Sequence, residues 1–298
     1  MNYKPLGDSS LRISEIGFGC MSLSGNDKDD STILNRAIEL GINFFDTADL
    51  YNKGMNEFSV GKALKEKRDK IILATKVGNE WKPDGSGWNW NPKKEYILTA
   101  ADESLKRLQT DHIDLYQLHG GTIDDPIDDT IEAFEQLKQQ GKILYYGISS
   151  IRPNVIREYV KRSNIASVMM QYSLLDRRPE EFCLEFLQAN NIGVLARGGL
   201  AQGLLVNKPP KDYLNYKSEE VKKAATVVQS LSSKKRTATQ TALRFVLNHP
   251  AITSAVIGIR TIEQLNEVVN TVSASPLADE KLNQLREAVK ANVYEQHR

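Results

Sequence analysis

Four side chains that can carry or stabilise a proton stand out in the first half of the chain: Asp46, Tyr51, Lys76 and His119. A free phenol is a poor acid at neutral pH, but an ammonium within a few ångströms stabilises phenolate and makes the phenol a usable proton donor. A carboxylate behind the lysine offsets the cost of burying the ammonium, and an imidazole N–H can polarise a carbonyl oxygen. The set therefore indicates carbonyl reduction, in which a cofactor supplies hydride and Tyr51 supplies the proton.

The elements that must position these side chains are short apolar runs separated by amphipathic, helix-period segments. Near-continuous apolar strands that alternate with helices are typical of a parallel sheet covered on both faces, and eight such units predict a (β/α)8 TIM barrel. No linker interrupts the pattern, so we expect a single domain over residues 1–298. The eight runs are 16–20, 42–46, 70–76, 113–119, 143–149, 167–171, 192–197 and 254–258.

Two segments depart from the repeat. Residues 3–14 contain a Gly-Asp turn between short alternating runs, which predicts a small β-hairpin that could close the bottom of the barrel. Residues 198–253, between the seventh and eighth strands, include two helix-period segments, 218–233 and 237–249. The sequence therefore predicts one helix more than the repeat requires.

Catalytic groups of such barrels lie at the carboxyl ends of the strands. Asp46, Lys76 and His119 end strands two, three and four, and Tyr51 follows on the loop after Asp46. Each of the four also has a purely structural interpretation. Asp46 could cap a helix, and Lys76 could reach from its strand end to solvent. His119 could be a core histidine, and Tyr51 could pack its loop. Four such coincidences at one rim are much less probable than a shared site. No nucleophile is paired with a base, which argues against acyl transfer.

Composition narrows the class of partner. Lys plus Arg (39) nearly equals Asp plus Glu (38), so no basic surplus indicates nucleic acid. No signal-peptide pattern or long apolar run is present, so we expect a cytoplasmic protein that does not bind a membrane. Two cysteines, Cys20 and Cys183, and four scattered histidines predict neither a disulfide framework nor a metal site. A small-molecule carbonyl is the expected partner, and we expect a monomer or small homo-oligomer.

A doubly wound dinucleotide-binding fold is the rival architecture. The run GFGCMS at 17–22 is similar to a glycine-rich phosphate fingerprint after a first strand. The third glycine is replaced by Ser22, however, and a polar segment follows where the fingerprint requires a helix. A bound dinucleotide must therefore be held in another way.

The chain resembles the aldo-keto reductases over essentially its whole length. The resemblance implies an NAD(P)H-dependent oxidoreductase whose tetrad is Asp46, Tyr51, Lys76 and His119, with Tyr51 as general acid. NADPH is the expected cofactor, and NADH is possible. The motifs that carry the resemblance are IGFGCMSL (16–23), FFDTADLY (44–51), ATKVG (74–78), IDLYQLH (113–119), YYGISS (145–150), MQYSLL (170–175) and VIGIRTIEQL (256–265).

The same resemblance implies a set of cofactor contacts. Ser149, Ser150 and Gln171 would meet the nicotinamide carboxamide, although Ser150 replaces the usual Asn. Leu200, Gln202 and Gly203 would lie along the pyrophosphate, and Arg260 with Gln264 near the adenosine 2′-phosphate. The other implied contacts are Gly19, Cys20, Met21, Asp46, Arg197, Gly198 and Gly258.

Physical chemistry independently supports an anion site after the eighth strand. Thr261 and Gln264 have the spacing of a capping box, so a helix is expected to begin there with free N–H groups beside Arg260. The alternative is a solvated arginine next to an ordinary cap. Near this helix, Ile257 and Val268 stand at positions where the aldo-keto reductases that the chain resembles more often have Pro and Asn. These replacements weaken the expectation that NADPH is preferred over NADH.

Arg197 is the main departure from the family pattern, because many members have an aromatic residue stacked on the nicotinamide at this position. A guanidinium can stack on a ring, but it repels a cationic oxidised nicotinamide. We hypothesise that Arg197 either turns to a phosphate or substrate carboxylate, or weakens binding of the oxidised cofactor relative to the reduced one.

Substrate clues come from Trp81, Trp88 and Trp90, which all follow Lys76 in one loop. Loops at this face build the substrate pocket, so aromatic walls for an apolar or aromatic carbonyl compound are expected. One or two of the rings could instead pack the loop onto the barrel. Two other functions stay open: a lyase that forms a Schiff base at Lys76, and a cofactor-binding, redox-sensing regulatory subunit with little turnover.

Overall fold

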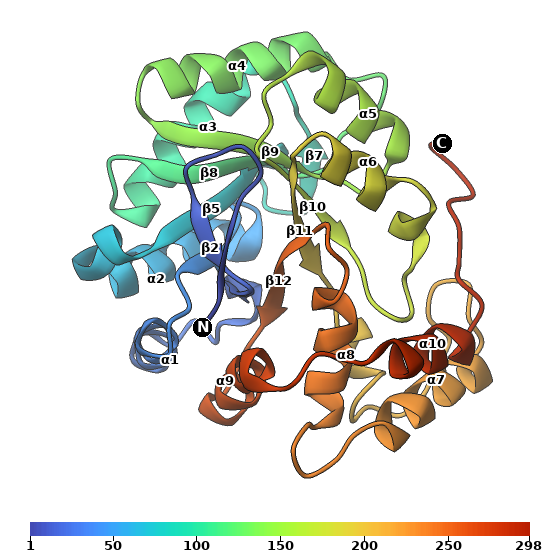
Figure 1. Cartoon of the computed structure of the whole chain (residues 1–298). Coiled ribbons are helices and arrows are strands. Elements are labelled where there is room, and N and C mark those ends of the chain that lie inside the picture. The colour runs from blue at the N-terminus through green and yellow to red at the C-terminus, as the bar shows by residue number, and fades with distance from the viewer.

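Eight parallel strands close into a barrel in the computed structural model, which describes residues 1–298 (Figure 1). Neighbouring strands follow chain order, and the last strand, β12, pairs with the first, β3, to close the ring. Each strand coincides with one of the eight apolar runs, so the predicted (β/α)8 barrel is confirmed. The barrel strands are β3 (Ile16–Gly19), β4 (Phe44–Asp46), β5 (Ile72–Val77), β8 (Ile113–Leu118), β9 (Ile143–Ser149), β10 (Ser167–Gln171), β11 (Gly193–Arg197) and β12 (Ile252–Gly258).

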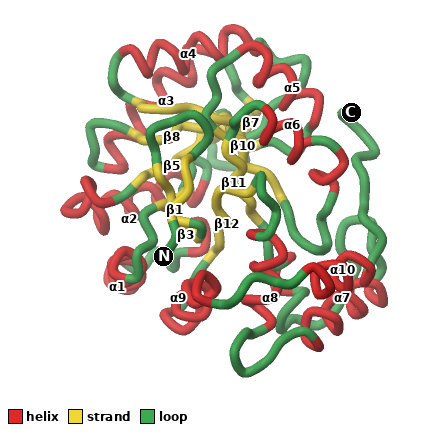
Figure 2. Tube along the Cα trace, viewed as in Figure 1, coloured by secondary structure: helices red, strands yellow, loops and turns green.

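Helices enclose the strands on the outside, as Figure 2 shows in red around yellow. None of these helices is long and apolar enough to cross a membrane. Two of them, α7 and α8, lie between the seventh and eighth barrel strands, as the sequence pattern indicates. The helices are α1 (Asp27–Glu39), α2 (Met55–Leu64), α3 (Lys94–Leu108), α4 (Ile127–Gln139), α5 (Pro153–Arg162), α6 (Cys183–Ala189), α7 (Ser218–Ser230), α8 (Ala238–Leu247), α9 (Ile262–Val269) and α10 (Asp279–Ala288).

Local sequence explains several helix starts. Asn26 caps α1 by accepting from the backbone N–H groups of Lys28 and Asp29. At α8, the Thr237 hydroxyl accepts from the Gln240 backbone while the Gln240 side chain accepts from the Thr237 N–H, a capping box. The buried faces of the helices and the outer face of the barrel form one cluster of 67 residues, in which α7 and α10 pack against each other.

The hairpin of β1 (Tyr3–Pro5) and β2 (Arg12–Ser14) closes the amino end of the barrel. Leu6, Leu11 and Ile13 are buried together with inward-facing strand residues such as Leu115. Leu6 fits closely because Gly193 lacks a side chain: a Cβ there would lie 2.6 Å from Leu6 Cδ1. The hairpin expected from the Gly-Asp turn therefore fills the end of the barrel opposite the strands' carboxyl ends.

A second hairpin, β6 (Asn79–Trp81) and β7 (Trp88–Trp90), follows β5 at the carboxyl rim. The sequence pattern predicted a loop here and not a hairpin. The ring of Trp90 lies against Gly78 and Gly120, where an added Cβ would be 2.6 and 3.3 Å from the ring. Both glycines have positive φ (121° and 139°), a backbone conformation that favours glycine. This packing holds the hairpin beside the catalytic rim.

Candidate active site

The four predicted catalytic side chains meet at the carboxyl rim of the barrel. Asp46 ends β4, Lys76 lies in β5, His119 follows β8, and Tyr51 opens a 3-10 helix, η2 (Tyr51–Gly54). The Lys76 ammonium donates to Asp46 Oδ2 at 2.7 Å and to the Tyr51 hydroxyl at 3.4 Å. The order carboxylate, ammonium, phenol is the one that proton donation by Tyr51 requires.

The Asp46–Lys76 pair is buried and ionised. Each carboxylate oxygen accepts a hydrogen bond, one from Lys76 and the other from Gln117 Nε2 at 3.2 Å, and both bonds favour the ionised form of Asp46. Burial raises the pKa of Asp46, and the Lys76 ammonium opposes this change. Burial also disfavours the charged form of Lys76, but Asp46 and Tyr51 together outweigh that effect and raise the pKa of the ammonium above its ordinary value. Lys76 is therefore a cation beside Tyr51.

His119 is a neutral imidazole. Burial, followed by the nearby charges of Lys76 and Arg197, lowers its pKa to about 3. Its ring meets the Tyr51 ring edge to face, with centroids 5.8 Å apart. The backbone is anchored at both polar groups, since the N–H donates to Val77 O and the carbonyl accepts from Asn79 Nδ2. A neutral histidine in this place can donate a hydrogen bond to an oxygen without adding charge.

The chain turns sharply after Tyr51. Asn52, Lys53 and Gly54 all have positive φ (49°, 54° and 83°), an uncommon conformation for a lysine. The hairpin β6–β7 supports this turn: Trp81 Nε1 donates to Leu50 O, and the Lys53 ammonium lies 5.2 Å from the centre of the Trp81 ring. Strained backbone held from outside is typical of functional sites. The only feature of the sequence that indicates this turn is the polar run Asn-Lys-Gly at residues 52–54.

A second buried acidic group supports the tetrad from behind. Glu57 is fully buried and accepts from Thr75 Oγ1 at 2.5 Å and from Arg107 Nε at 2.7 Å. Thr75 precedes Lys76, so this network ties α2 and α3 to the catalytic strand. Asp49 lies close by, and burial together with the charge of Glu57 raises its pKa to about 8. Neither acid stands out in the sequence, because residue type does not distinguish a buried acid from one at the surface.

The predicted cofactor residues lie around the same rim. Ser149 and Ser150 are buried at the end of β9. Gln171 and Arg197 are paired in register at the ends of β10 and β11, and Arg197 Nη1 donates to Gln171 Oε1 at 3.2 Å. Gly198, Leu200, Gln202 and Gly203 follow in a loop with the 3-10 helix η5 (Ala201–Gly203), where φ is positive at Gly198, Ala201, Gln202 and Gly203.

The other implied contacts gather where β12 meets β3. Gly258 pairs in register with Gly19, and a Cβ on Gly258 would lie 2.6 Å from Ser22 Oγ. Cys20 is fully buried, so only its backbone is available, whereas Met21 is exposed.

The start of α9 combines a capped helix end with the exposed side chain of Arg260. The Thr261 hydroxyl accepts from the Gln264 N–H at 3.2 Å, and Gln264 Oε1 accepts from the Arg260 N–H at 2.9 Å. The Gln264 side chain is thus engaged in capping, while the Arg260 side chain is exposed and forms no ion pair with an acidic residue.

A hollow of about 340 Å³ adjoins Tyr51, with Met21, Leu23, Leu50 and Met55 among its walls. None of the three tryptophans lines it. Trp81 is bonded to Leu50 O, Trp90 donates to both oxygens of Asp125, and Trp88 is exposed on the hairpin. Two of the rings therefore hold the hairpin and its neighbours in place.

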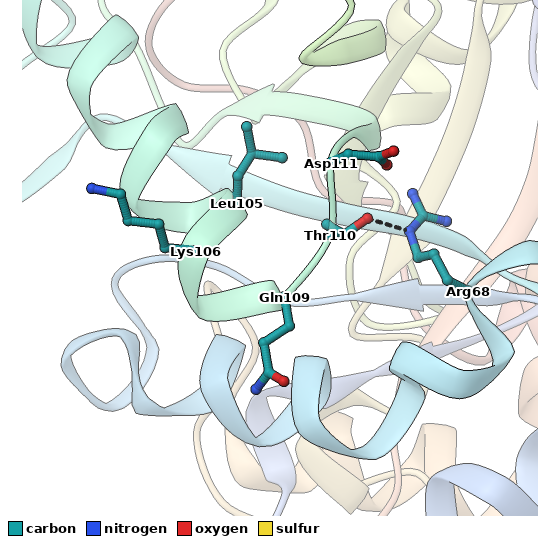
Figure 3. Close-up of a pocket in the computed structure, with 6 residues that line it drawn as sticks. All are labelled: Arg68, Leu105, Lys106, Gln109, Thr110 and Asp111. Atoms are coloured by element: carbon teal, nitrogen blue, oxygen red, sulfur yellow. Dashed lines mark hydrogen bonds between the residues drawn. The ribbon is translucent and has the colours of Figure 1, made fainter.

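A larger hollow, of about 620 Å³, is open to the surface at the other end of the barrel (Figure 3). It lies at the end of α3, where Arg68 donates to Thr110 Oγ1 at 2.9 Å. Arg68 is also paired with Asp114, near the start of β8. Because the tetrad lies at the carboxyl ends of the strands, this hollow is not part of the catalytic site.

Comparison with known proteins decides the family. The model described as "Aldo/keto reductase family" matches residues 15–290. The chain belongs to the aldo/keto reductase family. It is an oxidoreductase of that family, whose members use nicotinamide cofactors.

Three known proteins are similar to this chain over nearly its whole length. It is 50% identical to "Uncharacterized oxidoreductase YqkF" of Bacillus subtilis (strain 168), over 100% of both chains. The solved structure of "aldo-keto reductase AKR11C1 from Bacillus halodurans (holo form)" has a TM-score of 0.94 at 52% identity, and covers 100% of this chain and 99% of its own. "NADH-specific methylglyoxal reductase" of Escherichia coli (strain K12) is 29% identical over 96% of this chain and 98% of its own.

Proposed function

We propose that this reductase converts aldehydes or ketones to alcohols, with NADPH as the source of hydride and Tyr51 as the proton donor. The observation that carries the proposal is the Lys76 ammonium, which contacts both the Asp46 carboxylate and the Tyr51 hydroxyl in a buried rim. Such an arrangement serves a phenol that must lose and regain a proton.

The residues around the rim fit a nicotinamide dinucleotide. Gln171 has a partly exposed amide at the nicotinamide end, and Arg260 with the amino end of α9 offers positive charge at the other end. Between them, glycines at positions 19 and 258 leave the backbone bare where β3 and β12 meet. A reduced nicotinamide supplies hydride when bound. Arg260 supports NADPH over NADH, because its exposed side chain has no acidic partner to compete with a 2′-phosphate.

The protein's own contribution is to hold the carbonyl and deliver a proton. A carbonyl oxygen placed between Tyr51 and His119 receives two hydrogen bonds, and these strengthen as negative charge develops on the oxygen. Tyr51 then donates its proton to that oxygen. The remaining phenolate is stabilised by the Lys76 ammonium, which Asp46 keeps charged and oriented.

The expected substrate is a small carbonyl compound with an apolar portion. Met21, Leu23, Leu50 and Met55 form the apolar part of the hollow beside Tyr51, whose volume of about 340 Å³ suits a small molecule. The polar part of its lining comes from Ser24, Asp30, Asn52, Asn56 and Ser59. We further propose that the protein acts in the cytoplasm, as a monomer or a small homo-oligomer.

The test is absorbance at the reduced-nicotinamide band, with purified protein, NADPH or NADH, and a panel of apolar and aromatic aldehydes and dicarbonyls. We expect oxidation of NADPH by the wild type and a loss of at least a hundredfold in kcat for Tyr51→Phe, with cofactor affinity retained. Equal rates for the two proteins would exclude Tyr51 as the proton donor. Cofactor binding without turnover in the wild type would contradict the reductase and favour a sensing role.

A further inference from the structure

The Gln171 side chain is held at three points. Its Oε1 accepts from Arg197 Nη1 at 3.2 Å, and its Nε2 donates to the Tyr213 hydroxyl at 2.7 Å. The backbone of Gly198 packs against its stem, where an added Cβ would lie 3.1 Å from Gln171 Cγ. Gly198 has a φ of 74°, so the glycine is required both for conformation and for this approach.

These contacts determine which way the amide points. A guanidinium only donates hydrogen bonds, so the amide atom that faces Arg197 must be the oxygen. The NH2 group therefore faces Tyr213, whose hydroxyl accepts. Gln171 keeps one free N–H and one free lone pair, which is what pairing with another carboxamide requires.

Tyr213 is itself positioned independently of any ligand. It is 7% exposed and begins a tight turn in which Tyr213 and Tyr216 exchange two backbone hydrogen bonds of 3.0 Å. The C-terminal segment after α10 anchors this turn: the Tyr216 hydroxyl donates to Lys290 O at 2.7 Å, and Asn292 Nδ2 donates to Asn215 Oδ1 at 3.3 Å. The Tyr213 phenol therefore presents a fixed acceptor to the Gln171 amide.

We propose that Tyr213 is a positioning residue for the nicotinamide half of the cofactor. It holds the Gln171 amide in the orientation that pairs with the nicotinamide carboxamide, and it does so from a segment that lies outside the motifs of the family. The inference rests on the proposed function, which places Gln171 at the carboxamide.

The experiment compares the whole cofactor with a fragment that lacks nicotinamide. NADPH and adenosine 2′,5′-bisphosphate are titrated by calorimetry into wild type and Tyr213→Phe, which removes only the hydroxyl. We expect the Kd for NADPH to rise roughly three- to tenfold, the effect of one neutral hydrogen bond, while the Kd for the fragment stays unchanged. An unchanged Kd for NADPH, or equal weakening of both ligands, overturns the proposal.

Tyr3→Phe is the matched control, because it removes a hydroxyl that donates to Gly41 O at the amino end of the barrel and does not contact Gln171. We expect it to keep the wild-type ratio of the two Kd values, and loss of NADPH binding alone in this variant overturns the assignment to Tyr213. If Tyr213→Phe does not fold, Tyr213→Leu keeps apolar bulk and is titrated in its place. A wild type that binds neither NADPH nor NADH overturns the proposed function, whereas an unaffected Tyr213→Phe overturns this inference alone.

Discussion

At the scale of single residues, His119 is a candidate hydrogen-bond donor that carries no charge at neutral pH. Its pKa is lowered from 6.5 to about 3 by burial and by the charges of Lys76 and Arg197. Because a lowered pKa keeps the imidazole neutral until the pH approaches 3, we expect kcat/KM to show no limb near pH 6.5 that arises from His119. The measurement is the pH profile of kcat/KM between pH 5 and 8. A limb near 6.5 that disappears in His119→Asn would contradict a neutral histidine.

Arg197 is a second prediction at this scale. Its guanidinium lies beside Gln171 and donates to the Gln171 amide oxygen, so it places a positive charge at the proposed nicotinamide end. We expect Arg197→Tyr to lower the ratio of the Kd for NADP⁺ to the Kd for NADPH by about tenfold, which corresponds to ~1.4 kcal/mol of relieved repulsion. Arg197→Lys keeps the charge and should keep most of the ratio. If neither variant changes the ratio of the two Kd values, the charge of Arg197 does not discriminate between the oxidised and reduced cofactor.

At the scale of elements, the hairpin β6–β7 supports the turn of residues 52–54 that follows Tyr51. Gly78 has a φ of 121° and faces the Trp90 ring, and the hairpin in turn bonds Leu50 O through Trp81. We therefore expect Gly78→Ala to destabilise the protein by roughly 1–3 kcal/mol and to lower kcat as well. Urea unfolding and turnover measure the two effects.

Gly87→Ala tests the same hairpin at a neutral position. An added Cβ there has nothing within 4 Å, and φ at Gly87 is not positive. Stability and kcat should both stay close to wild type. If the two glycine variants behave alike, the close approach of Trp90 to the backbone is not what holds the hairpin.

At the scale of the whole molecule, stability and chemistry lie at opposite ends of the barrel. The hairpin of β1 and β2 buries Leu6 completely at the amino end of the barrel, whereas the tetrad lies at the carboxyl rim. We expect Leu6→Ala to cost about 2–5 kcal/mol of unfolding free energy while kcat of the folded enzyme changes little. Denaturant unfolding and turnover at 25 °C measure both quantities.

The matched control is Leu144→Ala, which truncates a leucine that is 39% exposed on β9. It should change the unfolding free energy by less than about 0.5 kcal/mol. A fall in kcat for Leu6→Ala as large as that for Gly78→Ala would show that the two ends of the barrel are coupled.

The sequence by itself determined the eight strands and the common rim at which the four candidate catalytic side chains lie. Strand and helix periodicity are local properties, and once eight parallel strands close into a barrel their carboxyl ends must share one rim. Asp46, Lys76 and His119 could therefore be placed together from their positions at strand ends. The motifs on these strands and in the loops that follow them also indicated the family, and the match over residues 15–290 confirms it.

Only the tertiary structure decided how those side chains are supported. The left-handed turn after Tyr51, the hairpin 79–90, the buried Glu57 and the contact of Tyr213 with Gln171 all join residues distant in the chain or depend on loop conformation. Loops carry no periodic signal, and the pKa and orientation of a polar group depend on burial and on neighbours that residue type does not reveal. For that reason the meeting of the four candidate catalytic side chains at one rim was predictable, whereas the groups that orient them were not.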